Sequence, residues 1–239
     1  MILATHGILA NSVPPSPLNN GLVAVYKGEN NANDSYGSIN GTAMGGLTYS
    51  TGKSGNAFTY NNLNSYVQLP DSFKLSDSGS NAFSINFWVY LSAQNENIAQ
   101  GLFTNFRQSG SDGWGWMIWY YTGKVFFSRR NGTSSTYDLT TPLTYYNLMC
   151  QITVTRKNGA TKLYINGNLV ASDTSTVSTV YTTTHYPMIG VRQSYSPPIY
   201  DWYGQNGCKI DELNIWSREL TSTEVTELYN SGSGKFYPY

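Results

Sequence analysis

The hydrophobic pattern is clearest between residues 145 and 172, where three strand-like segments are separated by Asn158-Gly159 and Asn166-Gly167. An Asn-Gly pair supplies two residues that accept positive φ, as a type I′ hairpin turn requires. In the first segment hydrophobic residues occupy every second position, which is typical of a strand with one face on a core. These residues are Leu148, Cys150, Ile152 and Val154. The pattern predicts an antiparallel meander.

Strands are also predicted on both sides of the meander. The segment from Phe83 to Leu91 alternates throughout but has large residues on both faces, as expected of a central strand in a two-sheet sandwich. Thr221 and Glu224 form a capping box before a short hydrophobic repeat, which predicts a helix over 222–230. Further strands are expected at residues 22–26, 57–60, 66–69, 124–128 and 208–216.

Composition narrows the class of protein. The chain has 239 residues, 12% of them charged, and a formal net charge of zero. A β-sandwich of this length commonly forms one domain. The sequence has no basic stretch to indicate nucleic-acid binding and no run of about 20 apolar residues to indicate membrane insertion. Cys150 and Cys208 are expected to be small buried hydrophobes, and two cysteines with two histidines at no ligand spacing exclude zinc.

Residues 1–20 differ from the rest of the chain. A short apolar run is followed by Pro14, Pro15 and Pro17, which favour an extended, polyproline-like conformation. The apolar run lacks the basic region of a signal peptide, so we expect it to be retained. We therefore expect residues 1–20 to form an extended N-terminal docking arm that contacts a partner chain, ahead of a single domain over residues 21–239.

Several segments occur in the order found in laminin G-like, concanavalin A-like jelly-roll domains. They are residues 21–26, 31–35, 66–70, 83–89, 163–167 and 210–221. The chain resembles this family over about residues 21–232, although Tyr146 stands where the family usually has Trp ahead of the meander. The resemblance implies an all-β, two-sheet antiparallel jelly-roll sandwich with one short C-terminal helix. It also implies that calcium and glycans are candidate ligands.

The loop after the first strand is rich in oxygen ligands. Calcium takes six to eight oxygens from carboxylates, amides and carbonyls, and Glu29, Asn31 and Asp34 offer such oxygens. The resemblance would bring Asp211 of the last strand beside them, so the predicted metal ligands are Glu29, Asp34 and Asp211. The alternative is that the loop is an Asn/Asp turn cluster that satisfies its own backbone. Asp211 and Glu212 also interrupt the alternation of their strand, which favours a β-bulge.

Aromatic residues make up 15% of the chain and suit sugar or protein contacts. Between residues 114 and 120, those at even positions share one strand face and are expected to be core. The loop from 195 to 203 combines aromatics with two prolines, which limit backbone freedom and favour recognition. We predict a carbohydrate-binding set there: Tyr195, Tyr200, Asp201, Trp202 and Tyr203. The competing interpretation places this loop in a subunit interface, where Tyr and Trp are also enriched.

Enzymatic activity is not expected. Glycoside hydrolysis requires two carboxylates that flank the glycosidic bond. The hydrolases that share the resembled fold carry a Glu-x-Asp-x-x-Glu strand, which is absent here. Two histidines, at positions 6 and 185, leave no natural place for a Ser-His-Asp triad.

Residues 2–10 resemble the N-termini of bacteriophage structural proteins. The sequence hypothesis is therefore a virion protein made in the host cytoplasm: a fibre, tail or head-surface component that presents a glycan-binding type of jelly roll for adhesion. Its expected partners are other virion proteins, reached through the arm, a cell-surface or environmental glycan, and further copies of itself as a homo-oligomer. The alternative is a free, extracellular, lectin-like bacterial protein that binds carbohydrate, and a glycoside hydrolase is a more distant one.

Overall fold

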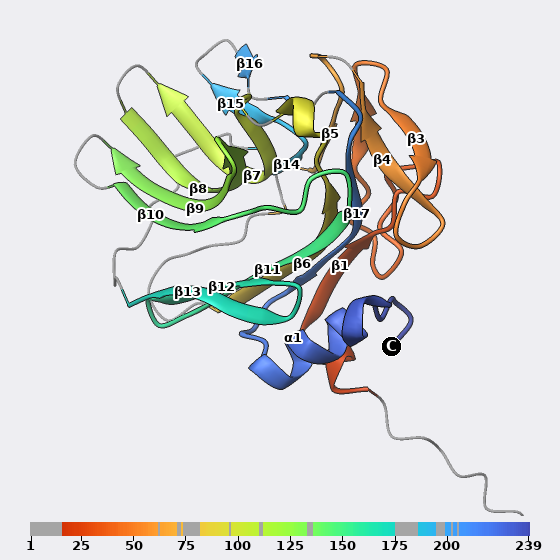
Figure 1. Ribbon diagram of the computed structural model, residues 1–239, viewed down its shortest axis with the longest axis vertical. Helices are drawn as coiled ribbons and strands as arrows, with labels where there is room; N and C mark the ends of the chain where they lie inside the picture. The colour runs from red at the N-terminus through yellow and green to blue at the C-terminus, as the bar shows by residue number, and fades with distance from the viewer. Residues whose placement is uncertain are drawn as a thin grey trace, which may run out of the picture.

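The computed structural model describes residues 16–61, 63–70, 73, 82–95, 97–109, 112–132, 136–174, 186–194, 199–201, 203–204 and 206–239. Its strands form two large sheets, almost entirely antiparallel, that pack face to face (Figure 1). This arrangement confirms the predicted all-β, two-sheet sandwich. The described residues contain no helix that is long and apolar enough to span a membrane.

Within these residues the first sheet has eight strands. Seven follow the order β13-β12-β11-β6-β17-β4-β3, and β1 pairs with β17. The predicted strands over 22–26 and 208–216 are found with the expected bounds, whereas β3 was not predicted. The strands are β1 (Leu22–Tyr26), β3 (Thr48–Thr51), β4 (Asn56–Tyr60), β6 (Phe83–Tyr90), β11 (Met149–Lys157), β12 (Ala160–Ile165), β13 (Asn168–Asp173) and β17 (Cys208–Trp216).

The second sheet has nine strands in the described part of the chain. Seven follow the order β10-β9-β8-β7-β14-β5-β2, and the hairpin of β15 and β16 joins the sheet beside β7. The strands are β2 (Thr42–Met44), β5 (Tyr66–Gln68), β7 (Gln100–Ser109), β8 (Asp112–Tyr121), β9 (Lys124–Gly132), β10 (Thr136–Pro142), β14 (Met188–Ile189), β15 (Arg192–Ser194) and β16 (Ile199–Asp201). Short helices complete the fold: η1 (Pro17–Asn19), η2 (Ala93–Asn95), α1 (Ser222–Tyr229) and η3 (Asn230–Gly232).

Both Asn-Gly pairs form the predicted hairpin turns. The φ angles of Asn158 and Gly159 are 50° and 85°, and those of Asn166 and Gly167 are 50° and 76°. These positive values match a type I′ turn. The turns set the register of β11 with β12 and of β12 with β13, which confirms the predicted meander.

Strand β17 changes partners halfway along one of its edges. Residues Cys208–Ile210 pair with β4, whereas Leu213–Trp216 pair with β1. Between these two halves the register with β6 shifts, and Glu212 has a φ of 49°. The predicted bulge at Asp211 and Glu212 is therefore present. It places both residues at the point where β17 exchanges β4 for β1, here called the notch.

Aromatic side chains fill the core between the sheets. Trp116 of β8 is fully buried, and its ring stacks on Phe83 of β6, with centroids 5.5 Å apart, and on Phe127 of β9. Ile118 and Tyr120 are buried on the same face as Trp116. These three described side chains confirm the predicted core face of the strand. The two free cysteines are buried, as predicted.

Helix α1 packs on the outer face of the first sheet, at the lower end of the molecule in Figure 1. The predicted capping box is present: the Thr221 hydroxyl accepts from the Glu224 N–H at 3.2 Å, and the Thr221 N–H donates to the Glu224 carboxylate at 2.8 Å. Val225 and Leu228 form the buried face of the helix. These apolar contacts hold a helix of eight residues that would be too short to persist alone.

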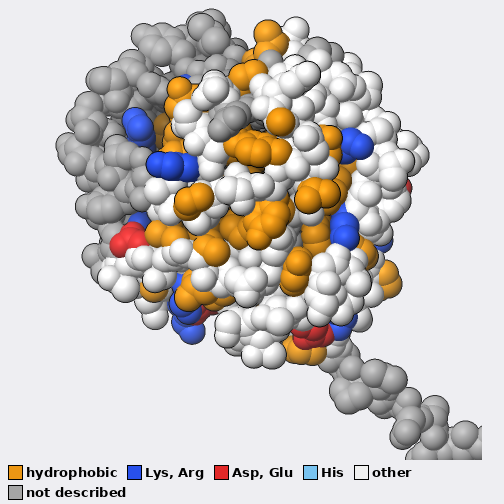
Figure 2. All heavy atoms as spheres, viewed as in Figure 1, with side chains coloured by type: hydrophobic (Ala, Val, Ile, Leu, Met, Phe, Trp, Pro, Cys, Tyr) orange, Lys and Arg blue, Asp and Glu red, His pale blue; other side chains and the backbone are white. Residues whose placement is uncertain are grey.

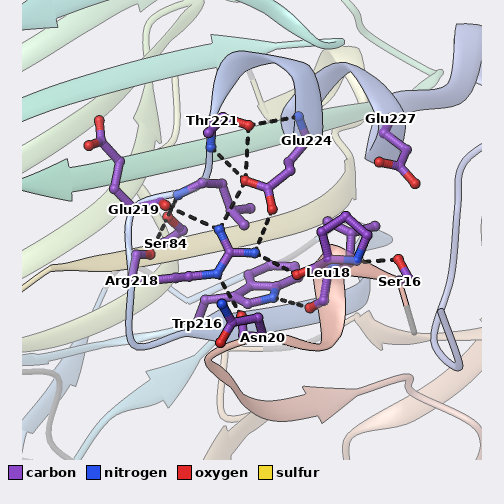
Figure 3. Close-up of polar contacts among 12 residues, drawn as sticks. Ser16, Leu18, Asn20, Ser84, Trp216, Arg218, Glu219, Thr221, Glu224 and Glu227 are labelled. Atoms are coloured by element: carbon purple, nitrogen blue, oxygen red, sulfur yellow. Dashed lines mark hydrogen bonds and ion pairs between the residues drawn. The ribbon is translucent and has the colours of Figure 1, made fainter. Parts of the chain in front are cut away.

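Residues 16–20, expected to belong to the arm, instead pack on the domain. Leu18 is fully buried, and its carbonyl accepts from the Trp216 indole N–H at 2.7 Å. Arg218 donates to the carbonyls of Pro17 and Asn20 (Figure 3). The packed domain therefore includes Ser16 to Asn20, and the predicted boundary at residue 21 is too late. Residues 1–15 lie outside the described part of the chain.

The Arg218 guanidinium also holds α1. Its two terminal nitrogens donate to the two oxygens of Glu224 at 2.9 and 2.6 Å (Figure 3). Partial burial alone would raise the pKa of Glu224, but the hydrogen bonds from Arg218 and Thr221 outweigh it and lower this pKa. One side chain thus ties the segment before β1, the end of β17 and the start of α1 together.

Candidate functional site

The predicted metal ligands fall into two places. Glu29 and Asp211 both contact the turn between β3 and β4, beside the notch in β17. Asp211 Oδ2 accepts from the backbone N–H groups of Lys53 and Ser54 at 2.6 and 3.0 Å, and Glu29 Oε2 accepts from the Asn56 N–H at 3.1 Å. The approach is close enough to require glycine, because a Cβ at residue 52 would lie 2.4 Å from Asp211 Oδ2. The structure therefore brings two of the three carboxylates to one turn.

Asp34 has a different role. Its Oδ1 accepts from the N–H groups of Val25 and Tyr36, and its Oδ2 accepts from the Ile39 N–H. These bonds close its own loop on β1, as the alternative of a self-satisfied Asx turn predicted. Among the described residues no three His, Cys, Asp or Glu side chains are grouped closely enough to hold a metal ion. The structure therefore groups Glu29 with Asp211 and sets Asp34 apart from them.

The carboxyl groups in the notch are strongly perturbed. Burial raises the pKa of Asp211 to about 7, although three backbone N–H groups partly oppose the rise. Burial, together with the charge of Asp211, raises the pKa of Glu212 to about 8. Asp211 Oδ1 and Glu212 Oε2 have no hydrogen-bond partner in the described structure. A buried carboxylate oxygen without a partner is costly, and a bound cation would remove that cost.

The predicted carbohydrate-binding loop coincides with the β15–β16 hairpin. Tyr200 and Asp201 lie in β16, opposite Gln193 and Arg192 of β15. Tyr195 and Trp202 lie outside the described residues. Tyr203 is half-buried, and its ring lies 6.5 Å from that of Tyr66. The hairpin stands at the upper end of the molecule in Figure 1, away from α1.

A row of aromatic rings on the outer face of the second sheet was not predicted as a site. Trp119 of β8 stacks on Phe126 of β9 with centroids 4.2 Å apart, and Tyr121 lies 6.4 Å from Trp119. The planes are nearly parallel, at 17° and 18°. The Trp119 indole donates to Ser128 Oγ at 2.6 Å, and Tyr121 is 40% exposed. The aromatic row, Phe126, Trp119 and Tyr121, is thus fixed in orientation and ends in an accessible ring.

Family membership follows from the sequence match. The family model described as Concanavalin A-like lectin/glucanases superfamily matches residues 58–226. The chain belongs to this superfamily. The two stacked sheets and the single C-terminal α-helix in the described residues are those of its jelly-roll domains, as the sequence resemblance implied. A search of curated proteins finds no match.

Solved structures with this superfamily fold cover most of the chain. The binding domain of Paraclostridial Mosquitocidal Protein 1 aligns with a TM-score of 0.71 and 22% identity, over 90% of this chain and 53% of that one. The receptor binding domain of botulinum neurotoxin D aligns with a TM-score of 0.69 and 18% identity, over 90% and 54%. The binding domain of botulinum neurotoxin DC in complex with SialylT aligns with a TM-score of 0.66 and 16% identity, over 90% and 52%. The chain thus spans about half the length of these structures, and at such identities the likeness concerns the fold.

Proposed function

We propose that this superfamily domain is a non-enzymatic adhesion module that binds glycans. The aromatic row is the observation that carries the proposal. Sugar rings present apolar C–H faces that pack on aromatic rings, and a ring held by its neighbours loses little freedom on binding. Tyr121 at the end of the row is accessible, and it packs beside Trp119, which is itself stacked on Phe126. The matched structures are themselves binding domains, which agrees with such a role.

The carboxyl groups of the notch support a role without catalysis. A glycosidase acid must reach the glycosidic oxygen, and its partner carboxylate must reach the sugar or a water beside it. Asp211 and Glu212 carry the raised pKa values expected of an acid catalyst, but they are 0% and 1% exposed. Buried in this way, they suit a structural role in the turn that they hold.

Binding to a glycan array tests the proposal. We expect Tyr121→Ala and Trp119→Ala to weaken binding by about tenfold or more, because truncation of a well-packed aromatic contact commonly costs about 2 kcal/mol. Tyr36→Ala is the matched control, since Tyr36 is similarly exposed at 43% and lies outside the row.

The β15–β16 hairpin, which carries part of the predicted carbohydrate-binding loop, is the second candidate surface. If Tyr200→Ala with Trp202→Ala abolishes binding and Tyr121→Ala does not, the hairpin rather than the row recognises the glycan. If the hairpin variants fail to assemble but still bind, the hairpin is a subunit interface. A wild-type domain that binds no glycan would contradict the proposed function.

The notch in β17 suggests a calcium ion as a structural ligand of the same module. Asp211 and Glu29 would hold it, with backbone carbonyls of the turn region as further oxygen donors. The support is the unpartnered, buried Oδ1 of Asp211 beside a second carboxylate on the same turn. Bound calcium would supply positive charge that offsets the burial of these groups.

The setting we propose for the module is a phage virion. The proposal rests on the resemblance of residues 2–10 to phage structural proteins and on the predicted contact of the N-terminal arm, residues 1–20, with other virion proteins. A mass-spectrometric inventory of purified particles should contain this chain, in several copies if it is a homo-oligomer. Its absence from such particles would favour the alternative of a free lectin-like bacterial protein.

A further inference from the structure

A groove of about 390 Å³ lies on the outer face of the first sheet. It is bounded by the end of α1, the β12–β13 turn, the segment that leads into β11, and the β3–β4 turn. Figure 2 shows hydrophobic side chains gathered across the middle of the visible face, with Lys and Arg around them. The described residues that line the groove are Lys53, Trp88, Tyr145, Leu148, Met149, Asn166, Tyr229 and Gly232.

A cation is fixed in this groove. The ammonium of Lys53 lies 4.6 Å from the centroid of the Trp88 ring, and Trp88 in turn stacks on Tyr229 at 6.0 Å. In the described part of the chain the Lys53 ammonium forms no salt bridge. The nearby Asp211 carboxylate accepts from the backbone N–H of Lys53 instead. None of the described lining residues is acidic. The described lining of the groove therefore carries a positive charge that no acidic side chain of that lining neutralises.

An amide donor also lines the groove. The Asn166 side chain accepts from the Gln151 N–H through its Oδ1 at 2.8 Å, which leaves its Nδ2 as the free end. The positive φ of the Asn-Gly turn holds Asn166 in this position. A Cβ at Gly167 would lie 3.0 Å from Tyr229, so glycine lets the turn close against the helix end. The turn, the amide and the ring are thus held in fixed relation.

The rim of the groove is apolar and exposed. Tyr145 is 41% exposed and Leu148 is 63% exposed, and both precede β11 in the segment that crosses between the sheets (Figure 1). Small-ligand sites are usually concave, about 300–1,000 Å³ in volume, and lined by apolar and aromatic groups with a few polar ones. This groove meets each of those criteria.

We infer that the groove binds a sugar residue that carries a carboxylate, with Lys53 paired to the carboxylate and Asn166 donating to it or to a hydroxyl. An anion is favoured because the cation has no acidic partner among the described residues and lies on low-dielectric aromatic surface, where a charge-assisted hydrogen bond is strong. A sugar ring is favoured over a small inorganic anion because the walls at Tyr145, Leu148 and Tyr229 match the C–H faces of a pyranose. The site is on the opposite sheet from the aromatic row, so the inference stands independently of the proposed function.

The test is a titration of the whole chain with glucuronic acid, glucose and inorganic phosphate, followed by NMR chemical shifts. We expect glucuronic acid to shift resonances of the groove residues and glucose to bind at least tenfold more weakly. Lys53→Gln should weaken glucuronic acid binding by at least tenfold. Lys209→Gln is the matched control, because Lys209 also lies over an aromatic ring, 5.6 Å from Tyr90, but does not line the groove.

Three outcomes would overturn the inference. Equal binding of glucuronic acid to the wild type and to Lys53→Gln would show that the cation does not hold the ligand. Equal binding of glucose and glucuronic acid would show that the carboxylate is not recognised. Phosphate binding as tight as that of glucuronic acid would show a simple anion site. Resonances of the groove residues report this site, whereas those of Phe126, Trp119 and Tyr121 report the aromatic row, so failure here is distinguishable from failure of the row.

Discussion

Replacement of Arg218 with alanine should lower the free energy of unfolding by about 3 kcal/mol. The change leaves the carboxylate of Glu224, whose side chain is 11% exposed, without its cation, and it leaves the carbonyls of Pro17 and Asn20 without donors. For a chain of this size the melting temperature should fall by roughly 6–12 °C. Thermal and denaturant unfolding measure both quantities.

Two comparisons make this prediction specific. Lys235→Ala breaks the ion pair with Glu227, in which both side chains are 35% exposed, and should cost only about 0–1 kcal/mol. The pKa of Glu224 is lowered in the fold, so its contribution is present above the unfolded pKa and is lost as pH falls through the lower, folded value. The difference between wild type and Arg218→Ala should therefore shrink in acid, below about pH 4. If the stability difference between wild type and Arg218→Ala is the same in acid, the ion pair with Glu224 is not the source of that difference.

Calcium should raise the stability of the domain by about 2.7 kcal/mol at a free concentration one hundred times its dissociation constant. The corresponding rise in melting temperature is roughly 5–10 °C. The physical reason is that the ion would bind the folded notch, where Asp211 and Glu29 meet, and not the unfolded chain. Melts in calcium and in chelator measure the difference.

The variants for this experiment follow from the hydrogen bonds. Asp211→Asn and Glu29→Gln should remove the calcium effect, whereas Glu219→Gln should retain it, because Glu219 pairs with Lys162 at another place on the domain. Asp34→Asn should also retain the calcium effect, since that carboxylate closes its own loop. A melting temperature that is the same in calcium and in chelator would show that the domain binds no stabilising calcium ion.

Local patterns in the sequence predicted the fold well because each depends on neighbouring residues. The turns at Asn158 and Asn166 follow from the positive φ that Asn-Gly tolerates, and the capping box of Thr221 and Glu224 needs residues three positions apart. The bulge at Asp211 was visible as a break in alternation. The change of partner at the bulge, from β4 to β1, was not visible in the sequence, because it joins segments that are far apart in the chain.

The site was harder to predict for the same reason. The family resemblance, and not the spacing of the residues, placed Asp211 beside Glu29. Asp34 lies apart from them because it accepts from three nearby N–H groups. Three prolines suggested that residues 1–20 were all arm, but apolar Leu18 finds a buried site beside Trp216. The alternation of β8 carries a signal for the aromatic row. If even positions of β8 face the core, Trp119 and Tyr121 must face outward.

The first and last described residues lie at one end of the domain, since the Asn19 side chain donates to the backbone oxygen of Tyr239 at 3.4 Å. The β15–β16 hairpin stands at the other end (Figure 1). A module built in this way can be inserted into a loop of a carrier protein without stretching either connection. Several copies on one carrier would then point their far ends outward together. Weak single contacts would combine into avidity without any new contact, provided that the spacing of copies matches that of the ligands.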